Sequence, residues 1–397
     1  MPGEWVFLTI FLVPMASGGT TAPSLAASPV VFARNFFRAI TEEPGPQANV
    51  LVSPAAARSA MTLVFMGAAG KSAEELRSNL ILGVAKKPEI AKQHAEFWSK
   101  ECTCAEKGVA LRLVTRLYVG EEEALRPDFN TTAMEFFNAQ ADAVDLAHPE
   151  AAVNKVNKWL ERQTFYTVKN LLKPASLSPT TSVVLVNSLF FRAKWTKTFP
   201  LENTSTEDFW INLRQRMEVP MMRQVGHFRY GESKRLKAQI LQLPFEDSNL
   251  TMMIILPKEI DGLAEMEEKL GELDMNEVAA RSKMQDVEVS FPKFRIEGEM
   301  DLKVPLKKMG ISRVFSPDEA DLSGLFANQK PQSISEARHK LYLLVNEAGC
   351  ETAPEPDTHI PKVKNNPDRK IFRADRPFVF AIRNFKAVYM VGHFMKP

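Results

Sequence analysis

Apolar residues recur with helical spacing in the first third of the chain. Ser53, followed by a proline, has the form of a helix N-cap with proline in the first turn, and it predicts a helix over 53–66. Ser72 and Glu75 have the spacing of a capping box, which predicts that a second helix begins at this serine. A third amphipathic pattern predicts a helix over 154–172. This part of the chain is therefore expected to be mainly helical.

The pattern changes in the middle of the chain to short apolar runs that are typical of strands. Two continuous runs, 183–186 and 252–256, are bounded by turn residues and predict strands buried on both faces. Further strands are predicted at 287–291, 341–345, 378–383 and 387–391, and further helices at 262–270 and 302–309. Helices and strands do not alternate regularly, so the pattern predicts an α+β fold and not a series of βαβ units.

No boundary divides the 397 residues into separate domains, because composition does not shift and no repeat or low-complexity linker occurs. Hydrophobic residues make up 45% of the chain and charged residues 25%, which is the profile of a globular protein with a packed core. The formal net charge of +2 gives no electrostatic case for binding nucleic acid or an anionic membrane surface. We therefore expect one large domain.

The N-terminus has the form of a secretory signal. An apolar run at 5–15 is too short to span a bilayer and is followed by Ala16-Ser17-Gly18, a pattern of small residues that suits signal peptidase. Glu4 opposes this interpretation, because a basic residue is expected before the apolar run. We expect a signal peptide at 1–18, a mature domain at 19–397 and a secreted, extracellular protein.

Three Asn-X-Ser/Thr triplets, beginning at Asn130, Asn203 and Asn249, are candidate N-glycosylation sites in a secreted protein. The alternative for each is an unmodified surface turn, since such triplets are common by chance. The three cysteines do not form a disulfide framework, because Cys102 and Cys104 are too close for an easy bridge and Cys350 makes the number odd. Burial of apolar surface is therefore expected to hold the core.

Motifs of enzymes and metal sites are absent from the sequence. The chain has no nucleophile elbow, HExxH motif, Walker loop or GxGxxG motif, and its six histidines are widely spread without a ligand partner at metal-binding spacing. A Ser-His-Asp triad could be assembled from distant residues, but nothing in the sequence supports one. We expect no enzyme activity, no metal and no cofactor.

The segment 346–372 differs from the rest of the chain. It contains several prolines, many charges and few large apolar residues, and it lies between two predicted strands. A loop of this length inside a compact domain is uncommon and is usually functional or disordered. Composition alone does not distinguish a functional loop from a disordered connection.

From Asn49 to Pro397 the sequence resembles the serpin family. The similar segments are Asn-Val-Leu-Val-Ser-Pro at 49–54, Val-Asn-Ser-Leu-Phe-Phe-Arg-Ala-Lys-Trp at 186–195, Phe-Pro-Lys-Phe at 291–294, Val-Asn-Glu-Ala-Gly at 345–349 and Phe-Arg-Ala-Asp-Arg-Pro-Phe at 372–378. The last segment is typical of arthropod serpins. Each segment is weak evidence alone, but the whole set in this order and spacing is specific.

The resemblance implies a single α+β domain with three β-sheets, about nine helices and an exposed reactive-centre loop, here at about 347–371. It also implies that a serine protease is the partner and that the protein is a monomer. An inhibitory serpin is cleaved in this loop and then inserts the loop as a new strand into its largest sheet, carrying the acyl-enzyme with it.

Several residues match family positions that control this insertion. Ser53, Asn187 and His339 match a buried polar cluster that governs the opening of the sheet, in which Ala56 stands where the family usually has a second serine. A second set, where the loop would enter the sheet, consists of Trp195, Lys293 and Glu347. We expect an ion pair between Lys293 and Glu347.

The hinge of the loop follows the inhibitory pattern only at its start. Glu347, Gly349 and the small Cys350 are compatible with insertion, but Pro354-Glu355-Pro356 replaces the small residues of inhibitory members. Proline lacks the N–H that a central strand donates, so insertion is expected to be slow. A slow loop leaves the protease time to deacylate. We therefore favour a non-inhibitory serpin; the alternative is a suicide inhibitor of a trypsin-like serine protease in an extracellular proteolytic cascade.

The expected cleavage site depends on the direction of counting. Counting forward from Glu347 by the family spacing places the bond near Val363-Lys364, and counting back from Pro377 places it near Asn366. Nearby lysines and arginines favour cleavage by trypsin-like proteases.

Overall fold

The computed structural model describes residues 28–42, 48–102, 109–178, 180–327, 332–351 and 366–397. Nine α-helices lie within these ranges, as the family resemblance implied. They are α1 (Ser28–Thr41), α2 (Pro54–Gly67), α3 (Gly70–Asn79), α4 (Lys87–Glu101), α5 (Pro127–Phe137), α6 (Pro149–Gln163), α7 (Leu263–Leu270), α8 (Met275–Ala280) and α9 (Lys303–Lys308). Short 3₁₀ turns occur at Pro174–Ser176, Leu201–Asn203 and Arg313–Phe315.

The strands form two hydrogen-bonded sheets. One has six strands in the order β10-β11-β12-β4-β2-β3, and the other has nine strands in the order β1-β15-β14-β8-β7-β6-β9-β13 with β5 paired to β6. The strands are β1 (Val50–Val52), β2 (Val109–Gly120), β3 (Ala141–Val144), β4 (Val183–Lys194), β5 (Ser205–Asn212), β6 (Gln215–Ser233), β7 (Ala238–Pro244), β8 (Thr251–Pro257), β9 (Lys283–Pro292), β10 (Phe294–Asp301), β11 (Ile334–Val345), β12 (Gly349–Cys350), β13 (Lys370–Arg373), β14 (Phe378–Arg383) and β15 (Val388–Phe394).

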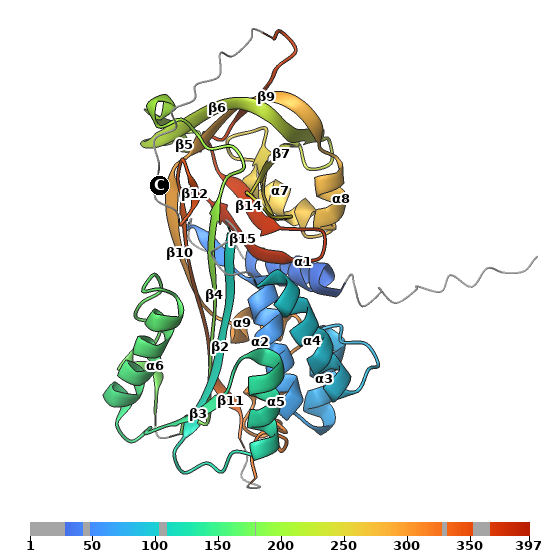
Figure 1. Cartoon of the computed structure of the whole chain (residues 1–397), viewed down its shortest axis with the longest axis vertical. Helices are drawn as coiled ribbons and strands as arrows, with labels where there is room; N and C mark the ends of the chain where they lie inside the picture. Colours follow the sequence, from blue (N-terminus) through green and yellow to red (C-terminus); the bar gives the residue numbers. More distant parts are fainter. Residues whose placement is uncertain (1–27, 43–47, 103–108, 179, 328–331, 352–365) are drawn as a thin grey trace, which may run out of the picture.

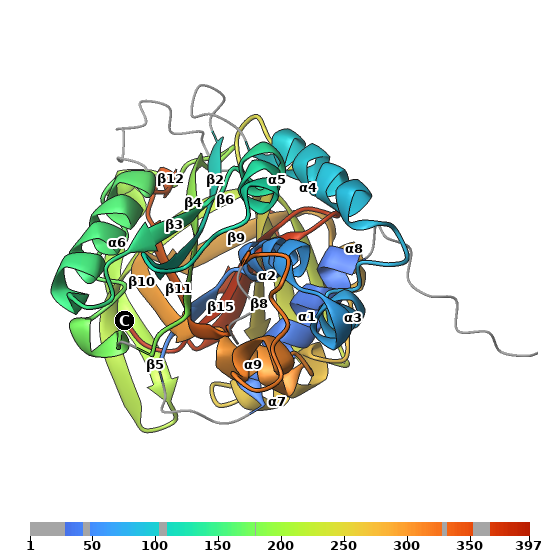
Figure 2. The ribbon, with the colours of Figure 1, turned by 90° about the horizontal axis from the view of Figure 1, so that it is seen from below.

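The long strand β6 divides the nine-stranded sheet into two arms. Its first part pairs with β5 and β9, and only its end, Arg229–Ser233, pairs with β7. With the arms counted separately, the molecule has the three sheets that the resemblance implied, and the α+β prediction is confirmed. Figures 1 and 2 show α6 on one face of the six-stranded sheet and α2 with α3 to α5 on the other.

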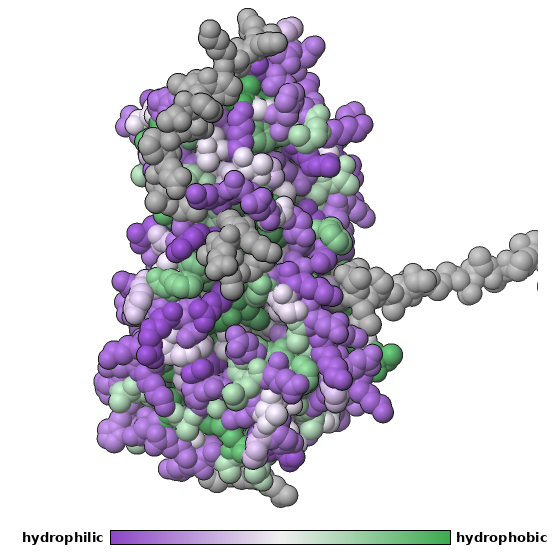
Figure 3. Space-filling view, viewed as in Figure 1, coloured by the Kyte–Doolittle hydropathy of each residue, from purple (hydrophilic) through white to green (hydrophobic). Residues whose placement is uncertain are grey.

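Three clusters of buried apolar residues hold these layers together. The largest joins α1, α2 and the neighbouring helices to both sheets, the second lies between the two sheets, and the third lies under α6. Most side chains of β4 and β8 are fully buried, which confirms the prediction from the apolar runs at 183–186 and 252–256. None of the described helices is long and apolar enough to cross a membrane, and Figure 3 shows polar residues spread widely over one face.

Local sequence signals placed some helices correctly and others wrongly. Ser53 caps α2 as predicted, since its Oγ accepts a hydrogen bond from the N–H of Ala56 at 3.0 Å. The predicted capping box is wrong: Ser72 lies inside α3, where its Oγ accepts from the N–H of Asp321, and Glu75 accepts from the N–H of Ser312. Both side chains therefore serve tertiary contacts instead of a helix end.

The helix predicted over 154–172 is wrong at both ends. The structure has α6 at Pro149–Gln163, and its proline occupies the first turn, where the missing N–H costs nothing. The helix ends early because Phe165 and Tyr166 adopt positive φ angles of 51° and 62°, which interrupt the helical path. The amphipathic pattern continues from residue 164 to 172, but these residues are not helical.

Candidate functional site

The beginning of the predicted reactive loop lies inside the six-stranded sheet. Strand β12 pairs antiparallel with β11 through Val345 and Cys350, and antiparallel with β4 through Gly349 with Lys194 and Cys350 with Ala193. Farther along, β11 and β4 pair directly with each other in parallel, from Ile334 with Val183 to His339 with Asn187. The hinge therefore occupies one end of a slot between β4 and β11, and at the other end the two strands pair directly with each other (Figure 1).

Trp195 holds the hinge at the entrance to this slot. Its backbone N–H donates to the carbonyl of Ala348 at 2.9 Å, and its indole Nε1–H donates to the carbonyl of Asn346 at 3.0 Å. The indole ring stacks on Phe245 with 4.7 Å between ring centroids and is buried. These contacts place Trp195 at the loop entry, where the family resemblance had put it.

The expected ion pair between Lys293 and Glu347 is present, with 3.1 Å between Nζ and Oε2. The carboxylate of Glu347 is buried and also accepts a hydrogen bond from the hydroxyl of Thr204 at 3.0 Å. Burial by itself would raise the pKa of Glu347, but hydrogen bonds from its own backbone, from Lys293 and from Thr204 outweigh it and lower the pKa. No sequence pattern indicates the contact with Thr204, which is 143 residues away in the chain.

Gly349 is required by its close approach to β4. Its φ is +154°, and a Cβ atom added to it would lie 2.0 Å from the carbonyl oxygen of Ala193. Any side chain at this position would push the hinge away from the sheet. The small residue that the hinge pattern demands here thus has a direct steric reason.

Glu351 ends the inserted strand. Its N–H donates to the carbonyl of Leu344 at 3.0 Å, and its side-chain Oε1 accepts from the N–H of Leu344 at 2.8 Å. In a longer strand, the backbone carbonyl of Glu351 would accept the hydrogen bond from Leu344, but here the side-chain carboxylate accepts it instead. The φ angle of Glu351 is +52°, which turns the chain away from the strand path. Burial raises the pKa of Glu351 to about 7. No local pattern indicates this contact between the side chain of Glu351 and β11.

Cys350 is fully buried in the apolar core between the sheets, and burial raises the pKa of its thiol well above the usual range. Alkylation of the native protein with iodoacetamide, followed by peptide mass spectrometry, is expected to modify Cys350 at least about 100-fold more slowly than in urea, because reaction requires local opening. The half-buried Cys102 provides an internal reference. Equal rates in the native and unfolded protein would show that Gly349–Cys350 does not occupy the sheet.

Ser53, Asn187 and His339 meet in a buried polar cluster, as the resemblance implied. The N–H of Ser53 donates to Nε2 of His339 at 3.0 Å, so Nδ1 carries the ring proton and donates to Oδ1 of Asn187 at 2.7 Å. Burial lowers the pKa of His339 to about 3 and keeps the ring neutral. The amide of Asn187 donates to the carbonyl of Ala56 and to the hydroxyl of Thr115. Thr115 therefore supplies the hydroxyl that Ala56 lacks.

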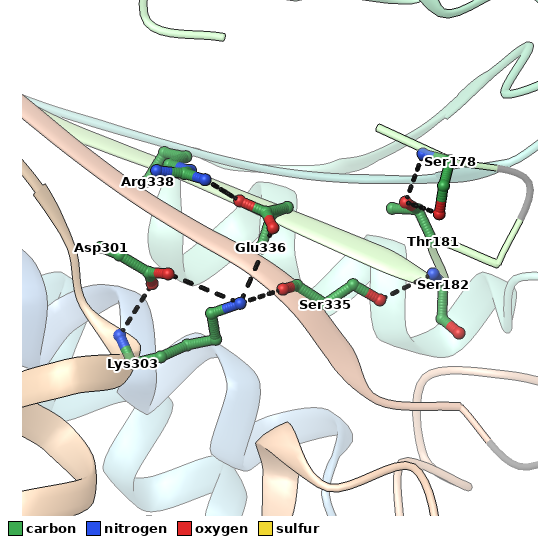
Figure 4. Close-up of polar contacts among 8 residues, drawn as sticks. All are labelled: Ser178, Thr181, Ser182, Asp301, Lys303, Ser335, Glu336 and Arg338. Carbon is green, nitrogen blue, oxygen red and sulfur yellow. Dashed lines mark hydrogen bonds and ion pairs between the residues drawn. The ribbon is translucent and has the colours of Figure 1, made fainter. Parts of the chain in front are cut away.

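A second set of polar contacts closes the far end of the slot (Figure 4). The N–H of Ser182, just before β4, donates to Oγ of Ser335 in β11 at 2.9 Å. Nζ of Lys303 donates to the carbonyl of Ser335 and lies 3.5 Å from Asp301 and 3.7 Å from Glu336. Separation of β4 from β11 along their whole length would break the Ser182–Ser335 contact.

Other predicted site residues lie apart from the slot or outside the described residues. Pro354, Glu355, Pro356, Val363 and Lys364 fall within 352–365, which the structure does not describe, and the signal segment 1–18 is likewise outside it.

The three candidate glycosylation residues lie on different parts of the surface. Asn203 and Asn249 are exposed, whereas both amide atoms of the half-buried Asn130 are hydrogen-bonded to the backbone of Ala141. Modification of Asn130 would break these bonds, so it is the poorest acceptor of the three.

Among the described residues, no group of His, Cys, Asp and Glu could hold a metal ion.

Comparison with known proteins agrees with this geometry. Residues 27–397 match the family model for Serpin (serine protease inhibitor). The chain is 34% identical to Serine protease inhibitor 42Dd of Drosophila melanogaster over 88% of its own length and 91% of that protein, and 30% identical to Antitrypsin of Bombyx mori over 91% of each.

Solved structures show the same relationship. The crystal structure of Serpin48 from the insect Tenebrio molitor, described as a highly specific serpin, matches with a TM-score of 0.85 and 31% identity, covering 94% of this chain and 98% of that one. Uncleaved ovalbumin matches with a TM-score of 0.83 and 26% identity, covering 94% and 100%. The chain therefore belongs to the serpin family.

Proposed function

We propose that this protein is a secreted, non-inhibitory serpin that trypsin-like proteases cleave as a substrate. The observation that carries the proposal is the register of β12 in the slot between β4 and β11. This register determines where each following loop residue would lie if insertion continued. The proposal of secretion depends on the signal-like segment at 1–18.

Continued insertion would bring the two hinge prolines to defined positions. Cys350 lies opposite Ala193 of β4 and Val345 of β11. In the same antiparallel register, Pro354 would lie between Leu189 and Leu341. Pro356 would lie two residues farther along, between Asn187 and His339, so it would separate the polar cluster.

The hydrogen-bonding phase of β12 determines which partner each proline would leave unsatisfied. The N–H of Trp195 donates to the carbonyl of Ala348, so even-numbered loop residues direct their backbone polar groups toward β4. Pro354 and Pro356 would both face β4 without an N–H to donate. The carbonyls of Leu189 and Asn187 would then each lose a hydrogen bond, at a cost of about 1–3 kcal/mol apiece.

The missing hydrogen bonds raise the barrier to loop insertion, and insertion competes with hydrolysis of the acyl-enzyme. An inhibitory serpin traps the acyl-enzyme only if its loop inserts before water releases the protease. Two adjacent defects on one side of a central strand slow insertion, since proline occurs essentially at sheet edges and bulges. The protease is then expected to complete hydrolysis and leave a nicked serpin.

Suicide inhibition of a trypsin-like protease is the second candidate. It is favoured by the part of the hinge that the sheet already accepts, namely Gly349 and Cys350, and by the intact Lys293–Glu347 ion pair. Relatives whose names describe them as inhibitors, the Drosophila serine protease inhibitor and the Bombyx antitrypsin, also support it. The prolines decide between the two candidates.

Incubation of the purified protein with trypsin distinguishes them. We expect denaturing gels to show cleavage between 362 and 370 without a covalent complex, and we expect the melting temperature of the nicked protein to stay within a few degrees of the intact protein. Edman sequencing of the new terminus identifies the cleaved bond and tests whether it lies near Val363-Lys364, where trypsin could cut after Lys362 or after Lys364. A band at the summed mass of serpin and protease would contradict the proposal and establish the inhibitor.

A further inference from the structure

A cavity of about 360 Å³ lies away from the hinge, between the start of α1, the helices α2 and α4, and the turn between β14 and β15. Its walls are mostly apolar and include Leu82, Ile90, Phe97 and Trp98. The ring of Phe385, 69% exposed, also lines it. This volume falls within the range of small-molecule sites in proteins.

The charged side chains that line the cavity are both cationic. They are Arg58 of α2 and Lys386 of the β14–β15 turn, and no carboxylate is among the described lining residues. Nε of Arg58 donates to the carbonyl of Leu80 at 3.1 Å, which positions the guanidinium group. Burial lowers the pKa of Arg58 to about 10, so the group is still charged at neutral pH. Nζ of Lys386 lies 2.7 Å from Glu101, which is not part of the lining.

The polar contact between Ser59 and His94 in the wall is neutral. Nδ1 of His94 lies 2.9 Å from the carbonyl of Phe136 and therefore carries the ring proton, so Nε2 accepts from the hydroxyl of Ser59 at 2.6 Å. Burial lowers the pKa of His94 to about 4, which makes it a weak general base at neutral pH. The Ser59–His94 pair therefore adds polarity without negative charge, and the site is suited to binding and not to catalysis.

We propose that this cavity binds a small amphipathic monocarboxylate, with its hydrocarbon tail among the apolar walls and its carboxylate beside Arg58 and Lys386. Apolar walls supply affinity for the tail, and charge-assisted hydrogen bonds to guanidinium and ammonium groups select the acid. The site is separate from the loop hinge, so the ligand would be carried independently of cleavage by proteases.

Quenching of tryptophan fluorescence tests the proposal directly, because Trp98 is part of the wall. Titration of the full chain with 11-bromoundecanoic acid is expected to give saturable quenching, since bromine quenches tryptophans at short range. The neutral analogue 11-bromoundecan-1-ol is expected to bind roughly tenfold to a hundredfold more weakly, because it loses the charge-assisted contacts. The Trp98→Phe variant should lose the saturable signal.

Three variants test whether residues that line the cavity are responsible for binding. Arg58→Gln is expected to weaken the acid by tenfold or more, whereas Lys92→Gln, a matched loss of charge at an exposed residue of α4 outside the lining, should leave binding unchanged. Gln93→Phe adds a large ring at an exposed lining position without adding a tryptophan, and it should reduce quenching.

Two results would overturn the proposal, and neither depends on how the variants fold. One is equal affinity of the wild type for the acid and the alcohol, which would show that charge is not recognised. The other is the absence of saturable quenching by the acid up to its solubility limit, which would show that the cavity is not a site.

Discussion

Replacing both hinge prolines by alanine is expected to turn this serpin from a protease substrate into an inhibitor. In the Pro354→Ala/Pro356→Ala variant, two N–H groups become available to the carbonyls of Leu189 and Asn187 during insertion. The gain is about 2–6 kcal/mol for two hydrogen bonds. If this gain is realised in the transition state, insertion becomes at least about tenfold faster, since 1.4 kcal/mol corresponds to a factor of ten in rate.

Gel electrophoresis after reaction with trypsin measures the outcome as the fraction of protease in a covalent complex. We also expect the melting temperature of the cleaved variant to rise by roughly 10 °C or more, because an inserted strand adds about ten backbone hydrogen bonds of about 1 kcal/mol each. Pro367→Ala is the matched control, since this proline lies after the expected cleavage bond, and it should remain a substrate. A double variant that is still cleaved without a complex would show that the prolines are not the obstacle.

The His339→Ala variant is expected to lose about 3–5 kcal/mol of stability. The change leaves the N–H of Ser53 and Oδ1 of Asn187 without their partner in a fully buried site, and it removes the volume of the ring. Equilibrium unfolding in urea at pH 7.5 gives the measurement. His227→Ala provides the control, because this residue is exposed on β6 and its loss should change stability by less than about 0.5 kcal/mol.

The difference in stability between the wild type and the His339→Ala variant should depend on pH. His339 has a pKa of about 3 in the folded protein against a reference value of 6.5, so below pH 6.5 the unfolded chain binds a proton that the native state does not. Wild-type stability is therefore lost as pH falls from 6.5 toward 3, by about 1.4 kcal/mol per pH unit from this residue. The difference between wild type and His339→Ala should shrink by about 2 kcal/mol between pH 6.5 and 5. A constant difference would show that His339 has the same pKa in the native and the unfolded state.

The pattern of apolar and polar side chains, together with local capping signals, was sufficient to predict most of the secondary structure. Continuous apolar runs identified β4 and β8 because strands buried on both faces need apolar residues at every position. Ser53 followed by proline identified the start of α2 because capping is a contact within one turn. The same reasoning failed at Ser72, whose hydroxyl has a partner 249 residues away.

The candidate site was predictable in part. The resemblance brought Ser53, Asn187 and His339 together and paired Lys293 with Glu347, and the structure contains these contacts. The substitution of Ala56 suggested a missing hydroxyl, but Thr115 on the neighbouring strand supplies one. The contacts of Glu351 and Lys303 were not expected, because they depend on the register and packing of the strands.

The sequence by itself determined the fold class, the family and the presence of the two prolines that we propose oppose insertion, because each is expressed in local patterns or in ordered motifs. The tertiary structure alone decided how far the hinge enters the sheet and which carbonyls the prolines would leave unpaired. A shift of one residue in register exchanges the two faces of a strand and the directions of its backbone groups. That choice is made by the packing of Cys350, Gly349 and Trp195 against β4 and β11, and no local pattern encodes it.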